Sequence, residues 1–151
     1  MLKDIINDRI GSVIYVVGNL VRGLSSQAFT EKEFGITPEQ YLILLLIIEN
    51  EGVYQRQICE ITLKDRANVA RIIEILLQKG LIQKNIDSNG RRIFKIVATP
   101  KGKDLIEKIE PFDLEIREFI TRDISEEELN ITRRTLEKIR ENVISKVKLQ
   151  I

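Results

Sequence analysis

The chain has 151 residues, of which 43% are hydrophobic and 31% are charged, and its formal net charge is +1. These values are typical of one globular module and exclude a disordered chain. There is no histidine and only one cysteine, which removes the commonest general base and the commonest ligands of transition metals. Neither of the glycine-rich nucleotide-binding motifs is present. We therefore expect a protein that is not an enzyme and that binds no metal or cofactor.

The same sequence gives expectations about the compartment. The longest apolar run, residues 41–48, is far shorter than the ~20 residues that span a bilayer. No signal peptide is recognisable at the N-terminus, and a single cysteine fits a reducing environment. A cytoplasmic protein without membrane contact is expected.

The N-terminal region, residues 1–35, is predicted to be a dimerisation helix. Apolar residues recur at helical spacing from Leu2 to about Phe29. The stripe is wider than one core face needs, and a second copy of the chain is the simplest partner for it. The residues that we assign to this interface are Ile6, Ile10, Val13 and Val17.

The central region, residues 36–102, begins after a polar loop at residues 31–35. Thr37-Pro38-Glu39-Gln40 predicts a capped helix start, and the helix that follows is apolar on nearly all sides, as a buried central helix would be. A short helix is expected over residues 54–62 with Ile58 and Ile61 facing inward. Leu63-Lys64 is then a turn, and Asp65 is the N-cap of the next helix.

The helix after Asp65 has one apolar and one polar face. Its apolar stripe is Val69, Ile72, Ile73 and Leu76, and its opposite face is Ala67, Arg71, Glu74 and Gln78. Gly80 is expected to end the helix in the left-handed conformation. Two β-prone runs, residues 81–86 and 93–98, are joined by a segment that contains Asn89-Gly90, a strong hairpin signal.

The C-terminal region, residues 103–151, is predicted to add further dimerisation helices. Thr99-Pro100 opens a long helix that Pro111 should kink or break, and Ser125-Glu126-Glu127-Glu128 caps the last helix. The interface residues that we assign here are Leu136, Ile139 and Val143. The fold class is therefore mainly α with one small antiparallel β-hairpin, in the order α-α-α-α-β-β-α-α.

Positive charge is concentrated in the centre of the chain. Residues 64–103 contain ten Lys or Arg and three Asp or Glu, whereas the segments on either side each carry a net charge of −3. A helix with a basic outer face, followed by a hairpin with arginines at its tip, is the layout of a winged helix-turn-helix, and the charge fits phosphate binding.

This layout assigns contacts with double-stranded DNA. The base-reading candidates are Arg71 for guanine, Asn68 for adenine and Ala67 for a thymine methyl group. Lys64 and Arg66 are placed at backbone phosphates, and Arg91 and Arg92 in the minor groove. Lys84, Lys95 and Lys101 are either backbone contacts or ordinary surface residues. Arg71 has a structural alternative, an ion pair with Glu74.

From Thr37 to Gly102 the sequence resembles the multiple-antibiotic-resistance regulator (MarR) family of transcription factors. The matching pieces are TPEQYLILLLI, QRQICEI, DRANVARIIEILLQKGLI and DSNGRRIFKIVATPKG. The family's wing usually carries Asp-x-Arg, in which the aspartate braces the arginine. Here Gly90 stands at the aspartate position and Arg92 at the arginine position, so the brace is either missing or supplied by Asp87. Tyr54 stands where the short helix usually opens with Ser or Thr, which makes its hydroxyl a candidate phosphate contact. The resemblance implies a homodimeric regulator, often a repressor that a small ligand or oxidation releases from an inverted-repeat operator.

Two alternatives and one further site stay open at this point. The chain could be a winged-helix protein-interaction module that has lost DNA binding, or a redox-sensing regulator acting through Cys59, whose other interpretation is a buried core residue. Tyr15, Arg22 and Tyr41 are candidates for lining a small-molecule effector site between the dimer helices and the DNA-binding lobe.

Overall fold

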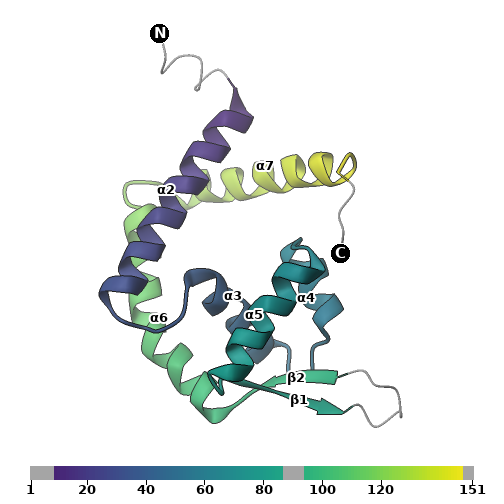
Figure 1. The fold of residues 1–151 in the computed structure, drawn as a ribbon. Coiled ribbons are helices and arrows are strands. Elements are labelled where there is room, and N and C mark those ends of the chain that lie inside the picture. Colours follow the sequence, from purple (N-terminus) through teal and green to yellow (C-terminus); the bar gives the residue numbers. More distant parts are fainter. Residues whose placement is uncertain (1–8, 87–93, 148–151) are drawn as a thin grey trace. The chain divides into compact units, whose positions relative to one another are not determined.

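The computed structural model describes residues 9–86 and 94–147. Their helices and strands follow the predicted order, with six helices and a two-stranded antiparallel sheet in the described part of the chain (Figure 1). The chain divides into two compact units, Met1–Tyr41 and Leu42–Ile151. No helix among the described residues is long and apolar enough to cross a membrane.

The first unit consists of α2 (Ile10–Glu31), the loop after it and the start of α3 (Pro38–Glu49). An aromatic cluster orders the loop: the Phe29 ring lies 5.2 Å from Phe34 and 5.5 Å from Tyr41, in edge-to-face geometry, and all three rings are buried. The prediction of a purely polar loop was therefore wrong, because Phe34 anchors it.

The predicted start of the first helix also needs correction. At Arg9 the backbone is extended, with φ −120° and ψ 99°, so one helix does not run from Leu2 through this position. The Arg9 carbonyl accepts hydrogen bonds from the backbone N–H groups of Ser12 and Val13 and so begins α2. The spacing of apolar residues predicts which face of a helix is buried, but it does not reveal a single residue with extended backbone. Ile6 lies outside the described residues.

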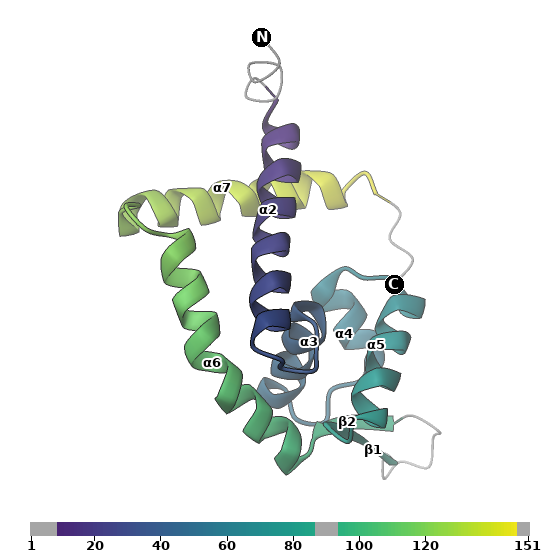
Figure 2. The same cartoon turned by 60° about the vertical axis from the view of Figure 1, so that its left-hand side comes forward.

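The second unit contains a winged helix-turn-helix and a last helix that follows it in the chain. It contains most of α3, then α4 (Gln55–Thr62), α5 (Arg66–Gln78), β1 (Ile82–Ile86), β2 (Phe94–Ala98), α6 (Pro100–Ile120) and α7 (Glu126–Ile144). Figures 1 and 2 both show the hairpin at the C-terminal end of α5. The strands pair from Ile82 with Ala98 to Ile86 with Phe94.

The capping box at Thr37, in the first unit, is present as predicted, since the Gln40 N–H donates to Thr37 Oγ1 (3.2 Å) and the Thr37 N–H donates to Gln40 Oε1 (3.1 Å).

The core of the second unit is almost entirely aliphatic. Helix α3 buries Ile43, Leu44 and Ile47 completely. The other core residues come from each remaining helix and strand except α7 and from the segments between them, and are Val53, Ile58, Cys59, Val69, Ile72, Ile73, Leu76, Leu81, Ile82, Ile96, Ala98, Ile106 and Ile109.

One inward residue of α4 was predicted wrongly. Ile58 is buried as expected, but Ile61 is 54% exposed and Cys59 takes the second core position. At about 100° per residue, the inward face of α4 is centred between Ile58 and Cys59, and Ile61 lies roughly 110° from that centre.

Pro111 was predicted to kink or break this helix; it lies inside the continuous α6, so the break does not occur. Proline removes one backbone N–H, and the carbonyl that loses its donor belongs to Glu107. Both residues are exposed, which lets water satisfy that carbonyl. Exposure therefore reduces the hydrogen-bonding cost of a proline at this position.

Candidate functional site

The turn between α4 and α5 fixes where the candidate reading helix begins. Leu63 ends α4 in the left-handed conformation (φ 54°), and Asp65 then caps α5, its carboxylate Oδ1 accepting the Asn68 N–H at 2.8 Å. This confirms Asp65 as the predicted N-cap. Because the cap satisfies a backbone donor that the first turn leaves unpaired, it sets the start of α5 at Arg66.

The two faces of α5 are as predicted. Val69, Ile72, Ile73 and Leu76 are all at most 2% exposed, and the four residues predicted on the opposite face are all exposed, namely Ala67, Arg71, Glu74 and Gln78. Gly80 ends the helix with φ 69°, its N–H bonded to the Leu77 carbonyl and the Leu81 N–H bonded to the Leu76 carbonyl. These two bonds form a Schellman motif.

Arg71 is placed at the middle of the exposed face. Its structural alternative was an ion pair with Glu74, but Glu74 Oε1 instead accepts a hydrogen bond from Gln78 Nε2 at 3.3 Å. Among the described residues, Arg71 has no ion-pair partner. Its guanidinium is therefore available to an anionic or base-edge ligand.

Asn68 is placed less favourably for reading bases. Its amide Oδ1 is buried and accepts no hydrogen bond in the described structure. A bidentate contact with adenine uses both amide atoms, so the side chain would have to rotate before it could make that contact. Ala67, one residue earlier, is exposed as the predicted thymine contact requires.

The cations at the start of α5 lie near the one cysteine. Cys59 is fully buried in α4, and this burial raises the pKa of its thiol, while the charge of Arg66 opposes the increase. A buried thiol with a raised pKa is largely protonated at neutral pH, and the thiolate is the reactive form. Lys64 is half-buried at the same helix entrance, and Arg66 is exposed.

The two predicted lysines of the hairpin differ in exposure. Lys84 on β1 is exposed, whereas Lys95 on β2 is half-buried and its chain crosses Gly52: a Cβ atom on Gly52 would lie 3.5 Å from Lys95 Cδ. The predicted minor-groove residues Arg91 and Arg92, with Asp87 and Gly90, lie outside the described residues.

Two predicted phosphate contacts have roles within the fold. Lys101 Nζ donates to the Lys79 carbonyl at 2.7 Å, at the C-terminal end of α5, where a cation is favourable. Tyr54 is the N-cap residue of α4, and its backbone N–H donates to Gln57 Oε1 at 2.9 Å.

A junction between α5 and α6 went unnoticed in the sequence. Thr99 Oγ1 donates to the Gly80 carbonyl (2.7 Å) and accepts from the Gly102 N–H (3.1 Å), so one hydroxyl joins both helix ends. A Cβ atom on Gly102 would lie only 2.1 Å from the Leu81 carbonyl oxygen. A glycine in the first turn of a helix, where alanine is normally better, was the available signal.

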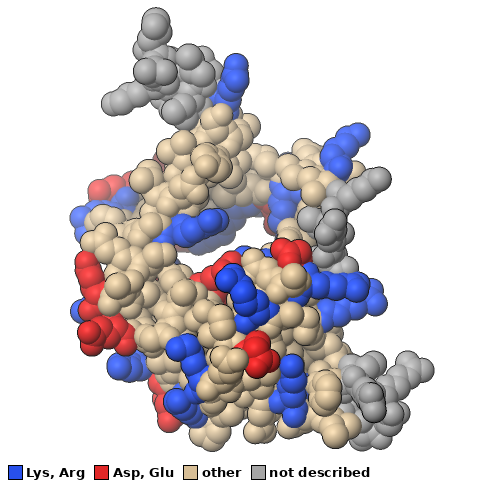
Figure 3. Space-filling view, in the orientation of Figure 1, with Lys and Arg blue, Asp and Glu red and all other residues tan. Residues whose placement is uncertain are grey.

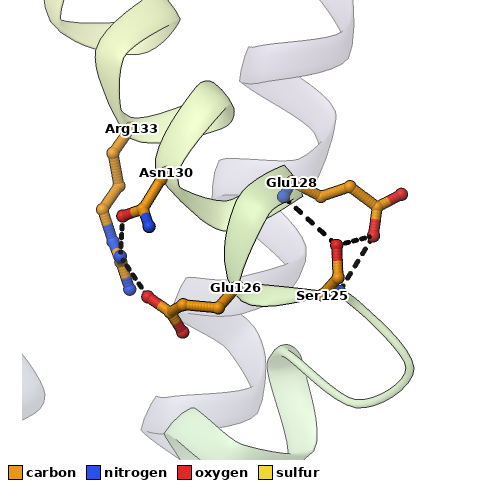
Figure 4. Close-up of polar contacts among 5 residues, drawn as sticks. All are labelled: Ser125, Glu126, Glu128, Asn130 and Arg133. Atoms are coloured by element: carbon orange, nitrogen blue, oxygen red, sulfur yellow. Dashed lines mark hydrogen bonds and ion pairs between the residues drawn. The ribbon is translucent and has the colours of Figure 1, made fainter.

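The predicted dimerisation residues that the structure describes leave apolar surface uncovered. Ile10, Val17, Leu136 and Val143 are exposed, and Val13 and Ile139 are half-buried. None of the described α7 residues is buried. The start of α7 is well ordered by polar contacts: Ser125 and Glu128 form the predicted capping box, and Arg133 binds Glu126 (3.1 Å) and Asn130 (3.0 Å) (Figure 4).

In the space-filling view, both basic and acidic side chains lie over α4 and α5 (Figure 3). Tyr15 and Arg22, two candidates for an effector site, are exposed on α2, whereas Tyr41 is buried in the aromatic cluster of the first unit.

No group of three or more acidic or cysteine side chains that could hold a metal ion is found in the described part of the chain.

A family model and a related protein identify the family to which this chain is similar. The MarR family model matches residues 34–93. The chain is 30% identical over 132 residues to an uncharacterised HTH-type transcriptional regulator, YybA, of Bacillus subtilis, covering 87% of this chain and 88% of that protein.

Solved structures agree with this assignment. A MarR/EmrR family transcriptional regulator from Acinetobacter sp. ADP1 superposes with a TM-score of 0.84 at 26% identity, covering 93% of this chain and 98% of that one. A putative MarR family regulator from Listeria monocytogenes, solved in complex with a 26mer DNA, gives a TM-score of 0.77 at 26% identity, covering 95% and 88% of the two chains. The capped α5, the hairpin and the α5–α6 junction are thus the winged helix-turn-helix of a known type, and the chain belongs to the MarR family of transcriptional regulators.

Proposed function

We propose that this regulator is a homodimer that binds double-stranded DNA sequence-specifically at an inverted repeat, with α5 as the reading helix. The observation that carries the proposal is Arg71: it is exposed at mid-helix, and within the described residues no acidic side chain pairs with it. An arginine in this position suits bidentate contact with guanine O6 and N7. The Listeria relative solved with a 26mer DNA supports the same role for this fold.

Around Arg71 we propose a division of roles. Ala67 contacts a thymine methyl group, and Lys64, Arg66 and Lys84 bind phosphates, which position the protein but carry no sequence information. The basic centre of the chain, with ten Lys or Arg between residues 64 and 103, supplies the salt-dependent part of the affinity.

We propose that the uncovered apolar side chains of α2 and α7 meet those of a second copy. Exposed apolar residues in a folded monomer mark an interaction site when they are numerous on one element. On α7 they are Ile131, Leu136, Val143 and Ile144. A two-fold dimer would present two α5 helices to successive major grooves, about 10 bp apart, which is why the site should be an inverted repeat. The mode that we propose is repression, relieved by a small-molecule effector.

The test of DNA binding compares Arg71→Ala with Arg133→Ala, a control that removes the same charge from α7. Loss of a bidentate contact costs about 1–3 kcal/mol, so Arg71→Ala should bind the preferred duplex roughly 5- to 150-fold more weakly. Arg133→Ala should bind as the parent does. Equal affinity of all three proteins for DNA would contradict the reading role of Arg71, whereas no DNA binding by the parent would favour a protein-interaction module.

The redox alternative has a separate test. Cys59 is fully buried and its pKa is raised, both of which disfavour reaction with peroxide. We expect peroxide to leave DNA binding unchanged in the parent and in Cys59→Ser, measured by fluorescence anisotropy. Loss of binding in the parent alone would restore the redox hypothesis.

A further inference from the structure

Two large apolar side chains face each other across the outer end of the described hairpin. Ile86 on β1 pairs with Phe94 on β2, and their exposed fractions are 76% and 44%. They belong to the same face of the hairpin as Ile82 and Ile96, because side chains two apart on a strand share a face. Ile82 and Ile96 are buried, so the apolar face continues beyond the core into the open.

The surroundings of this pair indicate what covers it. Lys84 lies on the same strand face as Ile86, and Lys95 is the neighbour of Phe94. Residues 82–98 contain four Lys or Arg and one acidic residue. Such a positive segment repels an identical hairpin from a second copy, and it attracts a polyanion.

We propose that Ile86 and Phe94 form an apolar contact with duplex DNA, packing on the deoxyribose rings that line the groove beside the hairpin while Lys84 binds a phosphate. This inference rests on the proposed function and assigns a part of it to the hairpin. Deoxyribose presents C–H groups at the groove wall, and other proteins that bind in the minor groove place apolar side chains against DNA, there by inserting them between base steps. The pair therefore adds affinity without neutralising any phosphate.

This chemistry predicts a signature that separates the pair from the cations. The logarithm of DNA affinity falls linearly with the logarithm of salt concentration, and the slope counts the phosphates neutralised. Removing an apolar contact should lower the affinity by the same factor at every salt concentration. Removing Lys84 should lower the affinity at low salt and make the slope shallower by about 0.9.

The experiment measures binding of the full chain to a duplex recovered by selection from random-sequence DNA, by fluorescence anisotropy across a salt series. The variants are Ile86→Thr, Phe94→Thr, the double variant and Lys84→Gln. Threonine keeps the β propensity of both strands, so the hairpin should be retained. Unfolding midpoints and sedimentation of each variant check the fold and the oligomeric state.

We expect about tenfold weaker binding for each single threonine variant, a larger loss for the double variant, and an unchanged salt slope. The inference is overturned if the double variant binds with parental affinity, or if its only change is a loss of self-association, which would place a second copy on the pair. If the parent binds no duplex at all, the proposed function itself fails, and the two failures are thus distinguishable.

Discussion

Helices α5 and α7 are both amphipathic, both begin with a side-chain cap, and yet they differ completely in burial. Over 13 residues α5 buries four aliphatic side chains, whereas α7 buries none over 19 residues. The core around α5 is thus complete within one chain, while the apolar side chains of α7 have nothing to cover them there. The difference separates a part of the molecule whose apolar face is covered within the chain from a part whose apolar face we propose is covered by a second copy.

The largest expected effect comes from the closest approach in the winged helix. Gly102→Ala places a methyl group 2.1 Å from the Leu81 carbonyl oxygen, a backbone atom that cannot move without disturbing β1. We expect a loss of about 4 kcal/mol in the free energy of unfolding, measured by denaturant titration. Gly18→Ala is the matched control on α2, where no atom lies within 4 Å, and it should stabilise by about 0.5–1 kcal/mol. Parental stability of Gly102→Ala would show that the junction between α5 and α6 is loose.

The comparison of α5 with α7 is sharpened by the same substitution in each. Leu76 is fully buried in α5, so Leu76→Ala should cost about 2–5 kcal/mol at any protein concentration. Leu136 is 44% exposed in α7, so Leu136→Ala should cost the single chain much less and should instead weaken dimerisation. Sedimentation equilibrium and unfolding at several protein concentrations distinguish the two. If both variants lost the same stability and the same self-association, the proposed difference between α5 and α7 would be contradicted.

A smaller effect is expected at the hydroxyl that joins the helix ends. Thr99 Oγ1 makes two hydrogen bonds, to the Gly80 carbonyl and from the Gly102 N–H. Thr99→Ala should therefore cost about 1–2 kcal/mol, and Thr99→Ser, which keeps the oxygen, should recover most of it. Thermal unfolding checks this order, and an equal loss in both variants would assign the role to the methyl group instead.

The smallest effect is a pH dependence at the start of α7. Hydrogen bonds from the Ser125 side chain and then from its backbone N–H lower the pKa of Glu128 below its ordinary value of 4.5. A carboxyl group whose pKa is lowered by folding stabilises the fold at pH values above its ordinary pKa. This contribution is lost as the pH falls through the pKa of the folded state. The difference in unfolding midpoint between the parent and Glu128→Gln should shrink as the solution is acidified. A difference that stays constant from neutral to acidic pH would contradict the assignment.

The sequence predicted the parts of the fold that local chemistry determines. The caps at Thr37, Asp65, Thr99 and Ser125 use a side-chain oxygen within three residues of its donor, so that pattern can be recognised directly. The apolar stripe of α5 is long enough to define a face without ambiguity. Both kinds of prediction are confirmed.

The errors arose where local pattern carries too little information. In the short α4, two isoleucines three apart suggested the wrong face, and Cys59 rather than Ile61 completes the core. Phe34 is buried in a loop because its ring packs on Phe29, which precedes the loop and itself packs on Tyr41 in the next helix. Pro111 was judged by its intrinsic effect on helices, whereas its exposure reduces the hydrogen-bonding cost at this position.

The candidate site was also predicted where local sequence determines it and missed where packing between elements determines it. The exposed placement of Arg71 follows from helical periodicity alone. The hydrogen bond of Lys101 to the Lys79 carbonyl and the buried amide oxygen of Asn68 depend on how elements pack, which no local pattern encodes.

The central claim is that α5 reads DNA from a complete winged helix while α2 and α7 join two copies. Selection of duplexes from random-sequence DNA by the purified protein tests both halves together. Our account predicts an inverted repeat whose half-sites lie about 10 bp apart, retained with an affinity that falls steeply as salt rises. Recovery of no preferred sequence, or of a single half-site without a symmetric partner, would contradict it.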